Sequence, residues 1–215
     1  MWSAQALTEE SCWTWRAPVA AGPVSNWPTI TRRTWGQCIN GAPVGSLEAA
    51  LALPAGSAGF VVVIGKPALR LKLCARIGER GHRLVNVIHP TAVVEPSAKL
   101  GVGVTIGAMA VVNSNACIGD AVLANTAAIV EHDAVIGDGV SLAPQSCVGE
   151  RSVVGAEAFM CLGALILPRL KIGAGAVIGA GAAVYDGIPD RVLALRAPAR
   201  PIRRLDESFD WAKLL

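Results

Sequence analysis

An uninterrupted six-residue repeat of apolar and small positions runs through the middle of the chain. Cut from Ile88, the sequence gives seventeen blocks (17 × 6 = 102 residues), of which sixteen begin with Ile, Val, Leu or Met; the exception is Ala124. The fifth position of a block is nearly always Ala, Val or Ser. Self-similarity at a fixed period is the sequence signature of a solenoid. Glycine is second in eight blocks, at positions 101, 107, 119, 137, 149, 155, 173 and 179.

Each block is expected to form a short strand followed by a corner. The first-position aliphatic side chain and the small fifth one point inward, where a larger fifth residue would overpack the core. Glycine at the second position lets the backbone turn where a Cβ would clash. Three blocks make one triangular coil, and only stacked coils bury their faces. The pattern therefore predicts a mainly β solenoid over residues 88–190, since a β-sandwich would instead show period-two alternation and strands spaced about eight to twelve residues apart.

The segments on either side of the repeat follow other patterns. Residues 36–87 are typical of a partial α/β unit, with expected strands at 60–64 and 84–88, a helix at 67–81 ending at Gly81, and a short helix at 46–53 with Ser46 as N-cap. Residues 1–35 hold five of the six tryptophans and show neither period, so we expect an irregular segment there. Residues 191–215 are expected to form a C-terminal tail.

Composition narrows the class of protein. Hydrophobic residues make up 53% of the chain and charged residues only 16%, which indicates a large core or an oligomer that hides further surface. A net charge of +3 is too small to favour nucleic acid or an anionic membrane as partner. We identify no transmembrane run and no signal peptide, so the expected location is the cytoplasm. The six cysteines form no CxxC pair, so reduced thiols are expected, without zinc.

One histidine, His132, lies between two carboxylates within the repeat, in VEHDAVIGDG at residues 130–139. Its neighbours are Glu131 and Asp133, and Asn125 precedes it in the same stretch. From the residues alone a plain structural interpretation stays open, in which the charges are solvated corner residues and Asn125 bonds a turn.

The repeat resembles that of the hexapeptide-repeat, left-handed parallel β-helix family. Residues 36–205 are similar to its sugar acetyltransferases of the sialic-acid and bacillosamine pathways, through WGQCINGAPVGSLEAALA, LVNVIHPTAVV, ANTAAIVEHDAVIGD and APARPIRRL. The resemblance implies an acyltransferase that moves acetyl from acetyl-CoA to an amine or hydroxyl of a sugar or nucleotide sugar. It also implies a left-handed coil and a homotrimer with active sites between neighbouring prisms.

The resemblance also implies roles for particular residues. His132 would be the general base, with Glu131, Asp133 and Asn125 as polar neighbours. An imidazole is the usual acceptor for the proton that an amine or hydroxyl loses on attacking a thioester. A carboxylate on its other nitrogen would fix the tautomer and favour the imidazolium. Acetyl-CoA is expected near Ser141, Leu162 and Ala180, with Arg200, Arg203 and Arg204 as phosphate partners or as a solvated basic tail.

The sequence departs from the family in three places. Many relatives carry a second histidine nine residues after the base, where this chain has Ser141. The glycine usual before the C-terminal PA[KR] is Arg196 here, a difficulty if φ at that position is positive. No Gly-rich, His-containing turn appears in residues 1–35, and the loop after residues 60–64 contains Lys66 and Pro67.

Three functions therefore stay open at this level. The first is the sugar acetyltransferase. The second is a catalytically idle trimeric scaffold that kept the prism and lost acceptor binding. The third is an acetyltransferase for a non-sugar acceptor such as serine. A zinc enzyme on this prism is rejected, because three histidines at ligand spacing are missing.

Overall fold

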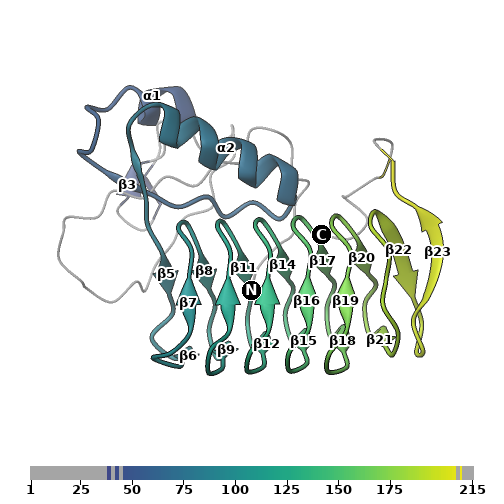
Figure 1. Cartoon of the computed structure of the whole chain (residues 1–215). Coiled ribbons are helices and arrows are strands. Elements are labelled where there is room, and N and C mark those ends of the chain that lie inside the picture. The colour runs from purple at the N-terminus through teal and green to yellow at the C-terminus, as the bar shows by residue number, and fades with distance from the viewer. Residues whose placement is uncertain (1–37, 40–41, 44–45, 207–208, 210–215) are drawn as a thin grey trace.

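The six-residue repeat winds into a stack of triangular coils, a β-solenoid prism (Figure 1). The structure, a computed structural model, describes residues 38–39, 42–43, 46–206 and 209. Each coil contributes one short strand to each of three parallel sheets. Strands that pair between coils are offset by 18 residues, as in Thr105 with Leu123 and Leu123 with Ser141. Three blocks of six therefore make one coil, as the repeat predicts.

The three faces of the prism are numbered here in chain order. Sheet 1 holds β5 (Val87–Ile88), β8 (Thr105–Ile106), β11 (Leu123–Ala124), β14 (Ser141–Leu142), β17 (Phe159–Met160), β20 (Val177–Ile178), β22 (Val192–Leu195) and β23 (Arg200–Arg204). Sheet 2 holds β6 (Val93–Val94), β9 (Val111–Val112), β12 (Ile129–Val130), β15 (Cys147–Val148), β18 (Leu165–Ile166) and β21 (Ala183–Val184). Sheet 3 holds β7 (Lys99–Leu100), β10 (Cys117–Ile118), β13 (Val135–Ile136), β16 (Val153–Val154) and β19 (Lys171–Ile172).

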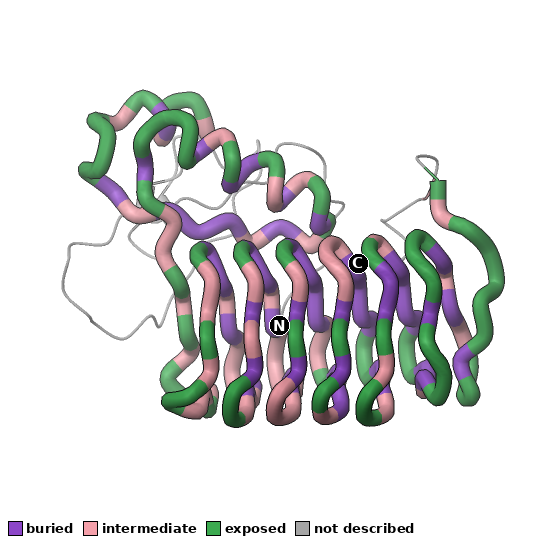
Figure 2. Tube along the Cα trace, in the orientation of Figure 1, coloured by how far each residue is buried: buried purple, intermediate pink, exposed green. Residues whose placement is uncertain are grey.

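The core of the prism is built from the first and fifth positions of the blocks. First-position residues such as Ile136 and Ile166 and fifth-position residues such as Ala134 and Ala164 are almost fully buried. Ala124, the one small first-position residue, is also buried. The predicted inward pattern is thus confirmed, and Figure 2 shows it as buried segments that recur in each coil.

Two different constraints act on the corners. The fourth position of every block from Gly103 to Gly181 has φ between 53° and 70°, in the left-handed region, whichever residue stands there. Second-position glycines do not have this φ; they are needed because the next coil passes too close. A Cβ on Gly155 would lie 2.5 Å from the backbone nitrogen of Ala174. The clash expected at the second position is therefore real, but it arises between coils.

The N-terminal unit packs along the prism over its first coils (Figure 1). Its elements are β1 (Cys38–Ile39), β2 (Ala42–Pro43), α1 (Leu47–Leu51), β3 (Gly59–Phe60), α2 (Pro67–Glu79) and β4 (Arg83–Leu84). Ser46 caps α1, its hydroxyl accepting a bond from the Ala49 N–H at 3.1 Å. Leu73 and Ile77, four residues apart, bury one face of α2.

Two expected strands differ from the sequence prediction. The strand expected at 84–88 is two strands, because β4 pairs with β3 whereas β5 already belongs to sheet 1 of the prism. Between them Asn86 bonds Gly101 O and Val104 N, which ties this link to the next coil. Only Gly59–Phe60 of the other expected strand pairs, although Val61, Val62 and Ile64 are buried. The segment 1–35 lies outside the described residues.

The expected C-terminal tail is partly structured. β22 joins sheet 1 parallel to β20, with Val177 opposite Leu193, a 16-residue offset that ends the regular period. β23 then turns back antiparallel to β22 and forms the last strand of that sheet. β23 is thus the C-terminal edge strand of sheet 1, and its arginines and Pro201 limit edge-to-edge association.

Replacement of Gly155 by Ala should destabilise the fold. The added Cβ would contact backbone atoms of Ala174, which cannot move without shifting a whole coil. We expect a loss of about 1–3 kcal/mol, measured as a lower Tm by calorimetry. Gly78→Ala is the control: it lies in α2 with open space at its Cβ and should be neutral or slightly stabilising. Equal Tm values for the parent and Gly155→Ala would contradict this account of the repeat.

Arg196→Gly should stabilise the protein. Arg196 has φ +84°, so the positive φ suspected at this position is present and is adopted by a side chain that disfavours it. Relief of left-handed strain, offset by the greater freedom of glycine in the unfolded chain, predicts a gain of up to about 1 kcal/mol. Lys99→Gly, in an exposed strand position, should instead lower the Tm. A lower Tm for Arg196→Gly would show that its side chain outweighs the strain.

Candidate active site

His132 lies at the corner between β12 and β13, where its side chain is 41% exposed. Its Nδ1 is 2.9 Å from Oδ2 of Asp133, the next residue in the chain. Asp133 occupies the left-handed fourth position of the block, with φ +60°. The corner thus turns this carboxylate onto the imidazole and supplies the pairing that the sequence analysis proposed for one ring nitrogen.

A second carboxylate holds the other ring nitrogen. Oε2 of Glu150 lies 2.9 Å from Nε2 of His132. Glu150 follows His132 by 18 residues (150 − 132 = 18), which is one coil, so it stands at the same corner of the adjacent turn. The sequence analysis did not single out Glu150. The 18-residue coil contained in the repeat was the signal that could have found it.

Polar ladders between coils fix both carboxylates. Asp133 accepts a bond from the Asn115 amide at 3.3 Å and lies 3.6 Å from Arg151 Nε. Glu150 pairs through its other oxygen with Arg169 at 3.2 Å. These partners come from three different coils, so the orientation of the imidazole depends on the stacking of the prism.

Glu131 has a different partner. Its Oε2 accepts a bond from the Asn113 side-chain amide at 3.0 Å, one coil earlier. Of the two acidic neighbours predicted for His132, only Asp133 contacts the ring. The contact of Glu131 is with Asn113, one coil earlier, and not with the ring.

The local charges favour the protonated ring. The hydrogen bond with Asp133, and to a lesser extent Glu150, raise the pKa of His132 above its ordinary value. The same hydrogen bond, with that from Asn115, lowers the pKa of Asp133. Because neutral imidazole can bond only one carboxylate as a donor, contact with two carboxylates indicates a resting imidazolium.

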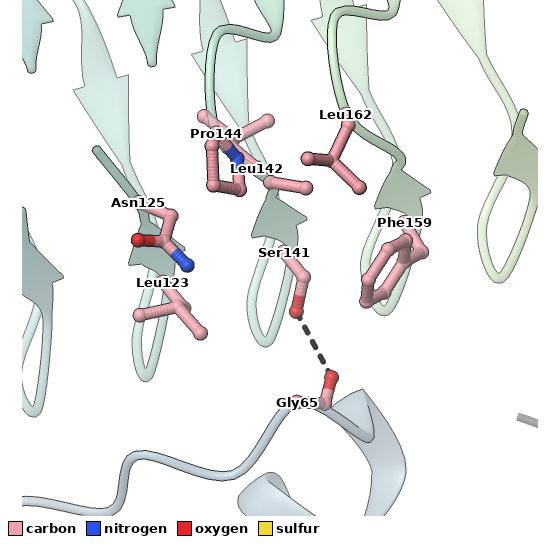
Figure 3. A pocket seen from close by; sticks show the side chains of 9 residues that line it. Gly65, Leu123, Asn125, Ser141, Leu142, Pro144, Phe159 and Leu162 are labelled. Carbon is pink, nitrogen blue, oxygen red and sulfur yellow. Dashed lines mark hydrogen bonds between the residues drawn. The ribbon is translucent and has the colours of Figure 1, made fainter. Parts of the chain in front are cut away.

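Asn125, Ser141 and Leu162 come together elsewhere, on sheet 1. They line a cavity of about 140 Å³ beside Gly65 of the N-terminal unit (Figure 3). Ser141 is 2% exposed and its hydroxyl donates to Gly65 O at 3.2 Å, so a ligand would meet its neighbours first. The Asn125 side-chain oxygen accepts from the Thr126 N–H at 2.7 Å.

A larger cavity adjoins the first. It measures about 670 Å³, lies between the N-terminal unit and sheet 1, and is mostly apolar. Asn125 borders both cavities, and His89 and Thr105 add polar groups to the larger one. The space is large enough for a small organic ligand.

Arg70 of α2 joins the N-terminal unit to the prism beside the smaller cavity. It is 1% exposed, and its guanidinium donates to carbonyls of both units, including Ala121 O at 2.7 Å and Gly139 O at 2.6 Å in the prism and Ile64 O in the N-terminal unit. It also donates to the Ser141 hydroxyl at 2.9 Å. Burial lowers the pKa of Arg70 to about 10, which still leaves it charged at neutral pH. The sequence analysis did not predict this contact.

The remaining predicted cofactor residues are exposed. Ala180 stands one coil after Leu162 at the same corner, where the Gly181 N–H bonds Leu162 O at 2.9 Å. Arg200 lies 3.5 Å from Asp186 and Arg203 stacks over Phe209. Arg203 and Arg204 are both in the exposed strand β23.

His132 and the cavities lie at opposite ends of one strand. Asn125 follows β11 and His132 follows β12, so sheet 2 separates the two groups within one chain. The structure thus brings together His132 with Asp133, and separately Asn125 with Ser141 and Leu162.

Solved structures with the same architecture include sugar-modifying enzymes. PerB from Caulobacter crescentus, in complex with CoA and GDP-perosamine, is 38% identical over 77% of this chain and 81% of its own, with a TM-score of 0.73. The acetyltransferase domain of PglB from Neisseria gonorrhoeae, in complex with acetyl coenzyme A, is 31% identical over 80% and 84%, with a TM-score of 0.76. WeeI from Acinetobacter baumannii is 29% identical over 80% and 84%, with a TM-score of 0.75. The chain belongs to the hexapeptide-repeat, left-handed β-helix acetyltransferases.

This acetyltransferase matches no family model and no curated protein. In the part of the acetyltransferase that the structure describes, no helix is long and apolar enough to span a membrane. The same residues contain no group of three or more His, Cys, Asp or Glu side chains placed to hold a metal ion. The four cysteines that can be assessed, Cys74, Cys117, Cys147 and Cys161, are free thiols.

Arg70→Met should loosen the N-terminal unit of the acetyltransferase. The substitution keeps an apolar stem but removes the Arg70 donors from Ala121 O and Gly139 O in the prism and from Ile64 O in the N-terminal unit. We expect a loss of about 2–5 kcal/mol, measured by urea unfolding. Arg76→Met is the control, because Arg76 pairs with Glu48 at the surface and should cost less than about 1 kcal/mol. Equal effects of the two substitutions would show that Arg70 does not join the units.

Proposed function

We propose that the chain transfers acetyl from acetyl-CoA to an amino group of a sugar, most simply a nucleotide-linked amino sugar. The observation that carries the proposal is the Asp133–His132 pair at a corner of a prism whose 38% identical relative holds CoA and GDP-perosamine. That relative is a GDP-perosamine N-acetyltransferase. An amine acceptor therefore stands ahead of the hydroxyl that the sequence alone left equally possible.

His132 is proposed as the general base. Once the resting imidazolium has lost its Nε2 proton, Asp133 keeps Nδ1 protonated and Nε2 can accept a proton. The acceptor amine attacks the thioester carbonyl carbon, a C–N bond forms, and the nitrogen gives a proton to Nε2. The tetrahedral intermediate then collapses, the C–S bond breaks, and His132 returns the proton to the sulfur of CoA. No nucleophilic side chain of the protein is needed, so the transfer is direct.

We propose that the working enzyme is a homotrimer in which a second copy completes each site. His132 and the cavities at Asn125 are separated by sheet 2, so a ligand in those cavities cannot reach His132 of the same chain directly. A neighbouring prism placed against sheet 2 would bring its own sheet 1 edge towards His132. The shared groove would then hold acetyl-CoA beside Leu162 and Ala180, with Ser141 at its wall.

The outer face of sheet 2 suits such packing. Its outward residues are all uncharged and mostly apolar, and Val93 and Leu165 are 51% and 41% exposed in the single chain. A flat apolar face of this kind is normally covered by another protein surface. The row consists of Val93, Val111, Ile129, Cys147, Leu165 and Ala183.

The larger cavity is proposed to receive the acceptor. Its apolar walls suit a sugar ring and base, and His89, Thr105 and Asn125 offer hydrogen bonds. Arg200, Arg203 and Arg204 on the exposed β23 are proposed to meet the phosphates of CoA. Because acetyl-CoA is an intracellular metabolite, the proposal also assigns the enzyme to the cytoplasm.

Removal of the base should abolish transfer without harming the fold. His132→Ala is expected to lower kcat about 10²–10⁴-fold, because the proton of the attacking amine loses its acceptor. The half-exposed side chain makes little core contact, so the Tm and acetyl-CoA affinity should stay near those of the parent. Rates are measured as CoA release with GDP-perosamine and other nucleotide-linked amino sugars. In the parent, kcat/KM should fall as pH drops through the raised pKa of His132, since only the neutral ring accepts a proton.

Ser114→Ala, at the same corner one coil earlier, is the matched control and should keep parent activity. An unchanged rate in His132→Ala would remove His132 from the mechanism. Acetyl-CoA binding by the parent without transfer to any acceptor would favour the idle scaffold instead.

A further inference from the structure

We propose that Glu150 is the residue that recruits the ammonium group of the acceptor and positions it at His132 Nε2. The inference rests on the proposed function and adds a role for Glu150, which the mechanism proposed above does not include. Glu150 Oε2 lies 2.9 Å from Nε2, the nitrogen assigned to proton transfer, so it stands where the attacking amine must arrive.

The resting contacts of His132 explain why a second partner is required. With Asp133 on Nδ1 and Glu150 on Nε2, the ring is held as an imidazolium between two carboxylates. In that state Nε2 already carries a proton and cannot act as a base. The ring therefore becomes reactive only when it loses that proton, and Oε2 of Glu150 then loses its cationic partner.

An acceptor ammonium satisfies both conditions. The imidazolium and an ammonium each carry one positive charge. An ammonium can therefore replace the imidazolium as the cationic partner of Glu150 Oε2 with no net change in the charge of the corner. A hydroxyl acceptor offers no charge and would leave Oε2 of Glu150 without a cationic partner, with Arg169 still on Oε1. The acidic corner thus favours an amine over a hydroxyl of the same shape.

Glu150 is held in a way that permits this exchange. Its Oε1 pairs with Arg169 Nη2 at 3.2 Å, so the side chain stays in place while Oε2 changes partner. Its side chain is 30% exposed and open to an arriving group. The other charges at this corner are Asp133 and Arg151, which pair with each other at 3.6 Å, and Glu131, which is bonded to Asn113.

The resting imidazolium of His132 releases its Nε2 proton to solvent as the acceptor ammonium binds, and it takes up a proton from solvent again after the product leaves. An acceptor R–NH₃⁺ brings three protons on nitrogen. One leaves to solvent as the ammonium becomes an amine, one passes through His132 Nε2 to the CoA sulfur as the C–S bond breaks, and one remains in the amide. Glu150 binds the ammonium and orients the amine, and no bond to it forms or breaks.

The first test is an NMR titration of the full-length protein labelled at histidine carbon, in which three histidines give three signals. In Glu150→Gln the pKa of His132 should fall, because one of its two carboxylate partners is removed. Glu157→Gln, at a corner between β16 and β17, is the control and should leave the pKa of His132 unchanged. An identical pKa of His132 in the parent and Glu150→Gln would overturn the pairing.

The second test separates recruitment from a structural effect. In Glu150→Gln we expect the KM for GDP-perosamine to rise about tenfold, with kcat changed by less than about threefold, and Glu150→Asp to recover part of the loss. The inhibition constant of the analogue with a hydroxyl in place of the amino group should stay the same in all three proteins. An equal loss of affinity for the amine and the hydroxyl analogue would overturn the proposal. Absence of transfer by the parent to any nucleotide-linked amino sugar would contradict the proposed function itself, whereas the titration judges the Glu150–His132 pair independently.

Discussion

The backbone ladder between successive coils is the constraint on which the rest of the structure depends. Within the regular coils each strand bonds to the strand 18 residues away. N–H groups and carbonyls of successive corners also bond, as in Asp133 N to Ser114 O and Arg151 N to His132 O. The register fixes which side chains stand above one another. The contacts of asparagine, carboxylate and arginine side chains around His132 follow from this register, because they join residues one coil apart.

The same constraint explains why the site is built from few residues and why it is rigid. Where coils approach closely, the second position of a six-residue block must be glycine. At the corners, the fourth position of each block from Gly103 to Gly181 has a left-handed backbone conformation. Asp133 occupies one of these strained positions, which turns its carboxylate onto the imidazole beside it. A contact between the side chains of adjacent residues is otherwise difficult, because consecutive side chains in a strand point in opposite directions.

The sequence predicted the prism because its period is carried by residues whose environments are uniform. Inward aliphatic side chains and small fifth positions appear in nearly every coil, so each supports the same interpretation. Contacts between distant parts of the chain were harder to predict from the sequence. Arg70 bonds carbonyls more than 50 residues away, and its role depends on how α2 docks, which no local pattern encodes. The division of residues 84–88 into β4 and β5 depends on the same docking. Glu150 differs from these, since the coil length alone placed it above His132.

His132 and the cavities beside Asn125 flank the strands of sheet 2, and we propose that neighbouring copies bring them together in one site. The most direct test of this proposal is a crystal structure of the protein soaked with acetyl-CoA. The account predicts a trimer in which the thioester carbon lies within reach of His132 Nε2 of one protomer, with the cavity beside Asn125 of the adjacent protomer opening onto the same groove. Acetyl-CoA bound away from His132, or a monomer with His132 facing only solvent, would contradict it.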